Sequence, residues 1–208
     1  MSSEKNINSL STTIIGVIII FSLLCGAICI MEEFLPGLGC LISIKPIQRS
    51  FSASDLLIGL SDMPPGWRVT EYESKLPPNV GPLTTYDSAY IRFEALDINI
   101  KRKIFQQYVY RYENSLCAES DYKSDVFRTH FGKIPSNWDF TSRYADESDF
   151  TCYDYEGRDQ TVCSWTARYQ ENIIMVFAWL IPGRMSIEDI KNIAKSIDAR
   201  IGSNLNEP

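Results

Sequence analysis

The sequence lacks the motifs by which most enzymes and metalloproteins are recognised. It has a single histidine, His130, and no cysteine pair at zinc spacing, no Gly-rich phosphate loop and no serine nucleophile motif. Basic charge is scarce as well, since 20 Lys and Arg stand against 26 Asp and Glu, for a net charge of −6. This balance argues against nucleic acid and anionic lipid head groups as partners, because both bind a basic face. No cofactor or metal is expected.

One long apolar run stands near the N-terminus. Residues 14–31 (IIGVIIIFSLLCGAICIM) carry no charge, and as a helix they would extend roughly 27 Å, close to the hydrocarbon thickness of a membrane. We expect a retained single-pass transmembrane helix from Ile14 to Met31, because the run exceeds the apolar length of an ordinary signal peptide. Two alternatives stay open: cleavage of this segment as a secretory signal, and lipidation of Cys40 in PGLGC, which loosely resembles a lipobox.

The apolar run sets the expected organisation of the chain. Lys5 on one side is nearly balanced by Lys45 and Arg49 on the other, so the positive-inside rule does not orient the run in the membrane. The cysteines of the domain have to decide the side. The expected order is a polar tail (1–13), the transmembrane helix (14–31), an interfacial segment and linker (32–53), one extracytoplasmic domain (54–202) and a C-terminal tail (203–208).

Residue alternation and apolar runs predict an antiparallel sheet of about six strands. Residues 89–96 and 104–112 should pair as a hairpin, after a loop over 75–88. Residues 173–181 (IIMVFAWLI) are apolar on both faces, which is typical of a strand in the middle of a sheet that is covered on both sides. The expected strands are 68–74, 89–96, 104–112, 138–144, 150–155, 161–169 and 173–181.

Helices are expected to pack with this sheet, two of them long. Each shows apolar positions on one stripe and a residue suited to one of its ends. The fold class is therefore α+β, preceded by one transmembrane helix. The expected helices are a short one over 54–60 with Ser54 as N-cap, one over 114–131 that stops at Gly132, and one over 186–201 with Ser186 and Asp189 as a capping pair.

The cysteines of the domain bear on its compartment. Gly157-Arg158 lies midway between Cys152 and Cys163 and suits a type II′ hairpin turn, which would place the two cysteines opposite each other on adjacent strands. Counting outward from the turn gives a hydrogen-bonded pair with Cα atoms about 5.5 Å apart, within disulfide range. We expect a Cys152–Cys163 disulfide and hence an oxidising compartment. The alternatives are pairing of Cys117 with either of them, and three buried thiols in a reducing compartment.

Few polar residues suggest chemistry, and each also has a structural interpretation. Asp146, Glu147 and Asp149 precede a strand and are candidate catalytic carboxylates, but their spacing matches no known cation loop and is typical of a solvated one. His130 falls late in an expected helix, where no nucleophile or carboxylate is placed beside it by any motif. A structural role is expected for this histidine.

Aromatic residues and a Pro-rich loop are the candidate contact residues. Aromatic side chains on strands can line a ligand groove, although one face of them is normally core. An exposed Pro-rich segment is pre-ordered for binding. The candidate partner or ligand contacts are Trp67, Pro77, Pro78, Tyr108, Tyr110 and Trp138, within a wider aromatic set that includes Tyr86, Tyr90, Tyr112 and Trp165.

The order of elements resembles a known fold. The pair Leu56-Leu57, the run 62–67 (DMPPGW), the closing hairpin and the helix from Ser186 are similar to the extracytoplasmic domains of bacterial anchored lipoproteins and sensor kinases, which adopt a PsbP-like α/β sandwich. The likeness spans most of residues 54–201. It implies a non-enzymatic binding or accessory domain, and it carries over no catalytic residues.

These observations lead to two functional expectations. The first is a membrane-anchored domain outside the cytoplasm that contacts a partner protein, such as a subunit of a membrane complex, or a small ligand. The second is a cell-envelope enzyme that uses acidic residues such as Asp146, Glu147 or Asp149. A secreted or lipidated form of the same domain is a variant of the first.

Overall fold

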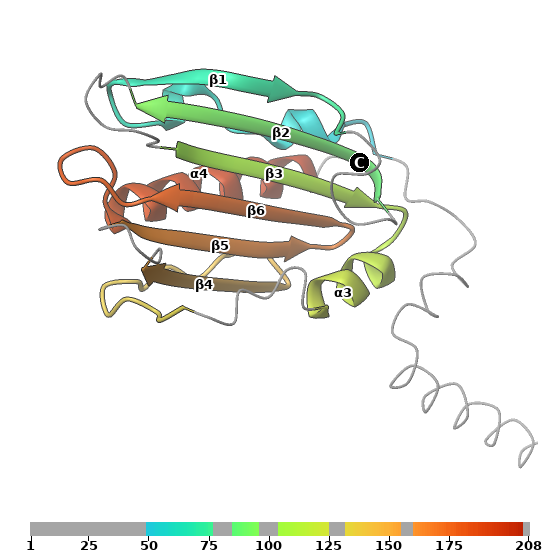
Figure 1. Cartoon of the computed structure of the whole chain (residues 1–208). Coiled ribbons are helices and arrows are strands. Elements are labelled where there is room, and N and C mark those ends of the chain that lie inside the picture. The colour runs from blue at the N-terminus through green and yellow to red at the C-terminus, as the bar shows by residue number, and fades with distance from the viewer. Residues whose placement is uncertain (1–48, 77–84, 96–103, 125–131, 155–159, 206–208) are drawn as a thin grey trace, which may run out of the picture. The chain divides into compact units, whose positions relative to one another are not determined.

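Six strands form one antiparallel sheet in the part of the chain that the computed structural model describes, residues 49–76, 85–95, 104–124, 132–154 and 160–205 (Figure 1). All of these residues belong to one compact unit, Ser43–Pro208. The α+β prediction is confirmed. In spatial order the strands are β1 (Trp67–Glu73), β2 (Thr85–Ala95), β3 (Ile104–Tyr112), β6 (Asn172–Trp179), β5 (Thr161–Tyr169) and β4 (Glu147–Asp154).

Strand pairing divides the sheet into two antiparallel halves. Strands β1, β2 and β3 pair in sequence order, and so do β4, β5 and β6. The halves join where β3 pairs with β6, so β6 lies between β3 and β5. The predicted hairpin of β2 with β3 is confirmed. The central place of the expected strand 173–181 is confirmed as well, although the strand is Asn172–Trp179 and ends two residues earlier than predicted. Strand β2 begins at Thr85, so the last residues of the expected 75–88 loop are strand instead.

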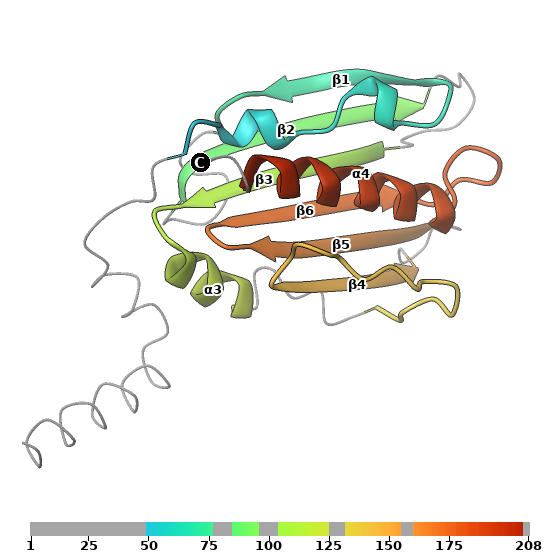
Figure 2. The same cartoon turned by 180° about the vertical axis from the view of Figure 1, so that it is seen from behind.

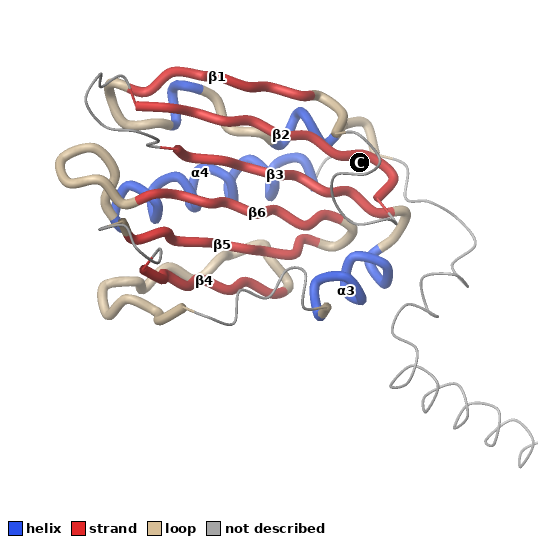
Figure 3. Tube along the Cα trace, viewed as in Figure 1, coloured by secondary structure: helices blue, strands red, loops and turns tan. Residues whose placement is uncertain are grey.

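Helix α4 (Ile187–Leu205) packs along one face of the sheet, and two short 3-10 helices lie on the same side, as Figure 2 shows. These are η1 (Ala53–Leu56) and η2 (Leu60–Asp62). Helix α3 (Ser115–Lys123) lies at one end of the sheet, where its Tyr122 hydroxyl donates to the Thr166 carbonyl at 3.5 Å (Figure 3). The helical layer is therefore on one face, with α3 apart from it.

The core lies between α4 and the sheet. Isoleucines at 3.6-residue spacing on α4 are buried against aromatic and aliphatic side chains that alternate along the strands. The predicted capping pair is confirmed, because Asp189 N donates to Ser186 Oγ at 3.2 Å and Ser186 N donates to Asp189 Oδ2 at 2.8 Å. The largest buried side chains that meet here include Phe93, Phe105, Trp165, Tyr169, Ile174, Ile190, Ile193 and Ile197.

The expected strand over 138–144 is absent from the sheet, so this prediction was wrong. Trp138 stacks on Phe150 with ring centroids 3.6 Å apart, and Phe140 packs edge-on against Trp165 at 6.0 Å. Both rings of this segment therefore reach the core. The sequence alternates between apolar and polar residues for this reason, although the backbone does not pair with a strand. The segment is instead fixed by side-chain hydrogen bonds to Asp198 of α4.

Both other expected helices differ from the prediction. Helix α3 ends at Lys123, because Ser124 is extended with a ψ of 157° and its N–H bonds back to the Asp121 carbonyl at 3.0 Å. Residues 125–131 lie outside the described part of the chain, so the expected stop at Gly132 stays a prediction. An added Cβ at Gly132 would lie 2.5 Å from Thr151 Cβ, so glycine permits a close approach to β4. The expected helix over 54–60 is two 3-10 turns, the first with Ser52 as N-cap.

Several predictions fall outside the described residues. They are the transmembrane helix Ile14 to Met31, the alternatives at Cys40, and the Gly157-Arg158 turn, together with His130. Among the helices that the structure describes, none combines the length and the apolar character that a membrane crossing requires.

Candidate binding face

A cluster of aromatic rings occupies the sheet face opposite α4. We call Tyr90, Tyr108, Tyr110 and Phe177 the tyrosine array. Tyr90 and Tyr108 are directly opposite in the β2–β3 register, and their ring centroids lie 4.7 Å apart. The centroids of Tyr110 and Phe177 lie 6.1 Å and 6.2 Å from that of Tyr108. The array therefore spans three adjacent strands and is centred on Tyr108.

Strand alternation explains why the array and the core are on opposite faces. Along β3, Phe105 and Val109 are buried in the core, so the alternate residues Gln106, Tyr108 and Tyr110 point to the opposite face. Tyr108 is opposite Met175 of β6, and Phe177 is two residues further along the same face. The β2–β3 hairpin and the strand β6, which is remote from it in sequence, thus contribute rings to one surface.

Polar side chains adjoin the array on β1, β2 and β3. We call Glu71, Arg92, Glu94 and Gln106 the polar rim. Gln106 Nε2 donates to the Tyr90 hydroxyl at 2.8 Å, and that hydroxyl lies 3.3 Å from Glu71 Oε2. Arg92 pairs with Glu71 at 3.2 Å and with Glu94 at 2.7 Å. The rim is therefore a connected set of hydrogen bonds and ion pairs that begins at a ring of the array.

Burial controls the protonation of the array. Tyr90 is 7% exposed and Tyr110 is 6% exposed, whereas Tyr108 and Phe177 are half-buried. Burial raises the pKa of Tyr90 to about 12, and it also raises the pKa of Tyr108 and the pKa of Tyr110. The phenols are neutral near pH 7. They can donate and accept hydrogen bonds, but they are poor bases and nucleophiles there.

The other predicted contact residues do not join the array. Trp67 is 3% exposed, belongs to the core and directs its indole Nε1 to the Arg184 carbonyl at 3.4 Å. Trp138 is packed against the core on Phe150. Pro77 and Pro78 lie outside the described residues. Of the six candidate contact residues, the structure brings together Tyr108 and Tyr110.

Phe177 and the polar rim were missed by sequence reasoning. Phe177 lies in an apolar run whose two faces look alike, so the run does not show which side chains leave the core. Gln106 looks like any polar residue of a half-exposed strand. Only the β3–β6 register could have placed Phe177 beside Tyr108.

Two of the three acidic candidates, Asp146 and Glu147, are held in ion pairs. Arg168 donates to Asp146 at 3.0 Å and to Glu147 at 3.1 Å, and Asp146 also accepts from Gln170 N at 2.7 Å. Asp149 is exposed on β4. Two of the three carboxylates thus join the start of β4 to β5. In the described ranges, no group of three or more His, Cys, Asp or Glu side chains could hold a metal ion.

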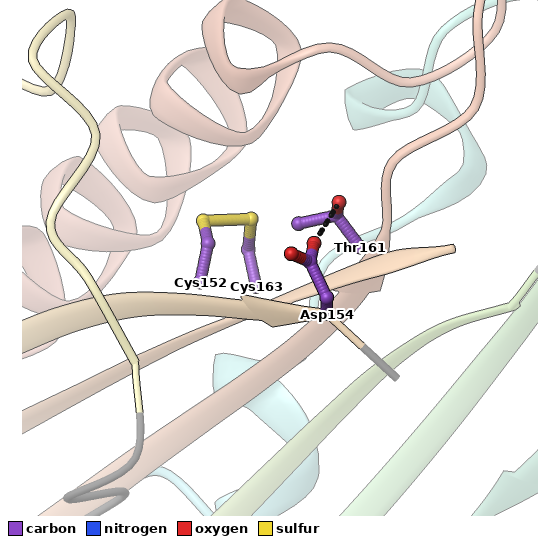
Figure 4. The surroundings of a disulfide bond; sticks show 4 residues. All are labelled: Cys152, Asp154, Thr161 and Cys163. Carbon is purple, nitrogen blue, oxygen red and sulfur yellow. Dashed lines mark hydrogen bonds between the residues drawn. A yellow bond between two sulfur atoms is a disulfide. The ribbon is translucent and has the colours of Figure 1, made fainter. Parts of the chain in front are cut away.

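Cys152 and Cys163 form the predicted disulfide across β4 and β5, next to a hydrogen bond from Thr161 to Asp154 (Figure 4). The expected backbone pairing was wrong. Cys152 N and O bond to Lys133 on the outer side of β4, so the cysteines form a non-hydrogen-bonded pair with Cα atoms 4.0 Å apart. This closer pairing suits a disulfide better.

Cys117 is buried in α3 and pairs with neither of these two.

Comparison with known proteins gives no relative from which a role could be carried over. No protein-family model, curated protein or solved structure matches the chain. The resemblance to PsbP-like domains therefore stays a prediction.

Proposed function

We propose that the chain is a membrane-anchored, non-enzymatic domain outside the cytoplasm that binds a partner protein through the tyrosine array and the polar rim. The observation that carries this proposal is the array itself: half-buried Tyr108 and Phe177 stand beside Arg92 and Gln106 on the sheet face opposite α4. Protein interfaces are enriched in Tyr, Phe and Arg for this combination of apolar area and hydrogen bonding.

A protein partner fits the shape of this surface better than a small ligand. The rings stand on three neighbouring strands, and a strand surface offers a broad area that another protein can cover. A small ligand is usually enclosed by a concave pocket that buries most of its surface. Binding of a small ligand remains the second outcome of the experiment below.

The disulfide supports the proposed compartment. Disulfides persist in oxidising compartments and are rare in the cytosol, so a Cys152–Cys163 bond favours a domain outside the cytoplasm. Residues 14–31 then supply the proposed anchor. With this topology, the partner is a membrane or envelope protein on the same side of the membrane.

The enzyme alternative gains no support from the acidic residues. A general acid or base needs a carboxyl group that is free to exchange a proton with a substrate. Asp146 and Glu147 instead share the Arg168 guanidinium at 3.0 Å and 3.1 Å. Their arrangement is that of a structural ion pair.

The experiment measures which partner proteins stay bound to the wild-type protein and to two matched variants. The full-length protein, Tyr108→Ala and Tyr86→Ala are each purified from native membranes in mild detergent, and co-purifying proteins are quantified by mass spectrometry. Tyr86 is 61% exposed on β2 and is not part of the array, so it controls for loss of a surface tyrosine. We expect a stoichiometric partner with wild type and Tyr86→Ala that falls about tenfold with Tyr108→Ala.

Two further measurements keep this test decisive. Unfolding curves of both variants show whether Tyr108→Ala still folds, and Gln106→Ala repeats the test at the polar rim with a smaller change in packing. A partner retained equally by all variants would overturn the proposed face. A protein that purifies alone but carries a small molecule lost with Tyr108→Ala would assign the face to a ligand instead.

A further inference from the structure

Strand β1 leaves a long exposed edge in the described sheet. It is the terminal strand next to β2, and every residue from Arg68 to Glu73 is exposed (Figure 1). Val69 is 43% exposed and Tyr72 is 56% exposed, which is a large exposure for apolar side chains on a sheet. An edge strand presents unpaired backbone N–H and C=O groups to its surroundings, so it is a ready template for another strand.

A β-bulge sets which side chains share a face of this edge. The β1–β2 register shifts between Val69 and Glu71, so Thr70 is the extra residue. In a regular strand, Arg68 and Glu73 would point to opposite faces because they are five positions apart, which is an odd number. The bulge changes this count and brings Arg68 and Glu73 to the same face.

The β2 partners of these residues confirm the two faces. Arg68 and Glu73 are opposite Glu94 and Tyr90, which lie on one face of β2 because they are an even number of residues apart. In the same way, Val69 and Tyr72 are opposite Phe93 and Ile91, which both face the core side. The exposed edge therefore carries a basic and an acidic end on one face, and two apolar side chains on the other.

We infer that β1 pairs with β1 of a second copy of this chain. The two strands run antiparallel around a twofold axis, with Arg68 opposite Glu73 of the second copy and Val69 opposite Tyr72 of the second copy. Twofold symmetry repeats each contact, so the interface has two Arg–Glu pairs and two Val–Tyr pairs. Directly opposite side chains of opposite charge, and aromatic residues beside β-branched ones, stabilise antiparallel pairs.

Charge complementarity selects this occupant and this register. Strand β1 is complementary in charge to an antiparallel copy of itself, because Arg68 of each strand then lies opposite Glu73 of the other. Shifting one strand by two residues would place Val69 opposite the bulge residue Thr70, and it would direct Arg68 to Glu71, which already pairs with Arg92. In the proposed register the two sheets join into one, and the Val69 and Tyr72 side chains are covered.

Charge reversal tests the pairing in the full-length protein. Wild type, Arg68→Glu, Glu73→Arg and the double variant are measured in detergent by light scattering across a concentration series. Each single variant puts like charges opposite each other at both pairs, so we expect about tenfold weaker self-association, and the double variant should restore it. Lys195→Glu, a reversal at an exposed position of α4, should have no effect. A wild-type monomer, or a dimer insensitive to these charges, would overturn the inference.

Cysteine cross-linking tests the register independently of charge. Chains with Val69→Cys and chains with Tyr72→Cys carry different affinity tags and are co-expressed. The proposed register predicts cross-links between the two kinds of chain, and far fewer between two chains of the same kind. Equal cross-linking in all combinations, or none, would contradict the β1 pairing. Neither variant alters the tyrosine array, so the result is independent of the proposed partner face.

Discussion

Arg49 Nε lies 2.9 Å from Oε1 of Glu171, whose side chain is fully withdrawn from solvent. The same guanidinium also donates to the side chain of Gln170 in the β5–β6 turn. Close by, Arg111 Nη1 donates to the Phe51 carbonyl at 2.6 Å, and its guanidinium lies over the Phe51 ring. Residues 49–51 are therefore held against the end of the sheet, before the first helix begins.

We expect Arg49→Ala to destabilise the domain by about 3 kcal/mol, because a buried carboxylate then loses its cation. Urea unfolding of wild type and variant measures the difference. The control is the same substitution in a Glu171→Gln background, where no buried charge is left behind and the cost should be much smaller. Equal costs in the two backgrounds would show that the Arg49–Glu171 pair does not carry the effect.

A buried carboxylate on α4 fixes the segment that precedes β4. Asp198 accepts hydrogen bonds from the Tyr169 hydroxyl at 3.0 Å, from Arg143 N at 3.0 Å and from Ser142 Oγ. Burial, together with the nearby Asp198 carboxylate, raises the pKa of Tyr169, so this phenol keeps its proton and donates it. The three donors come from two segments that α4 holds together.

Asp198→Ala should lower the free energy of unfolding by about 3 kcal/mol, since it leaves buried donors without an acceptor. Amide hydrogen exchange should also rise at Arg143, whose N–H loses its partner. In a Tyr169→Phe background one of these donors is already gone, and the further loss should be smaller. An unchanged exchange rate at Arg143 in Asp198→Ala would contradict the role given to this carboxylate.

The disulfide should contribute moderately to stability. It closes a short loop, with 11 residues of sequence separation between Cys152 and Cys163, and loops of this size are expected to gain about 2–3 kcal/mol. Cys152→Ala/Cys163→Ala should lose that amount in chemical unfolding. Peptide mapping under non-reducing conditions checks the bond itself, and free thiols at both positions in protein from native membranes would contradict the proposed compartment.

Much of the fold could be predicted because its local patterns agree with its tertiary structure. Alternation identified the β2–β3 hairpin, the two apolar faces of β6 indicated its central place, and the Ser186–Asp189 spacing marked the start of α4. The cysteine pair followed from counting outward from a turn, although the count mistook the kind of backbone pair. Such patterns are local, and no distant segment had to be known.

The wrong predictions and the missed site residues have the same cause: each depends on contacts between segments that are far apart in the sequence. Trp138 and Phe140 alternate like strand residues because both meet the core, while the backbone there is held by Asp198 on α4. The tyrosine array depends on the β3–β6 pairing, which joins segments far apart in sequence. Residue types alone suggested Tyr108 and Tyr110 but could not supply Phe177.

The tyrosine array should make the domain less stable at alkaline pH. Burial raises the pKa of Tyr90 to about 12, whereas a tyrosine in an unfolded chain ionises at about 10. The native state thus holds this proton more tightly, so the associated stability is fully present below about pH 10 and is lost as the pH rises through about 12. Tyr108 and Tyr110 shift in the same direction and add to the loss.

Tyr90→Phe should therefore reduce the loss of stability above about pH 10 without abolishing it. Unfolding free energies of wild type and variant, measured from neutral pH to about pH 12, give two curves. Near neutral pH, the difference in unfolding free energy between the two proteins includes the loss of the hydrogen bond from Gln106. This difference serves as the baseline. As the pH rises, we expect the wild-type protein to lose more unfolding free energy than Tyr90→Phe, so that this difference changes in favour of the variant. Curves that stay parallel through this range would show that the Tyr90 phenol ionises equally in the folded and unfolded chains.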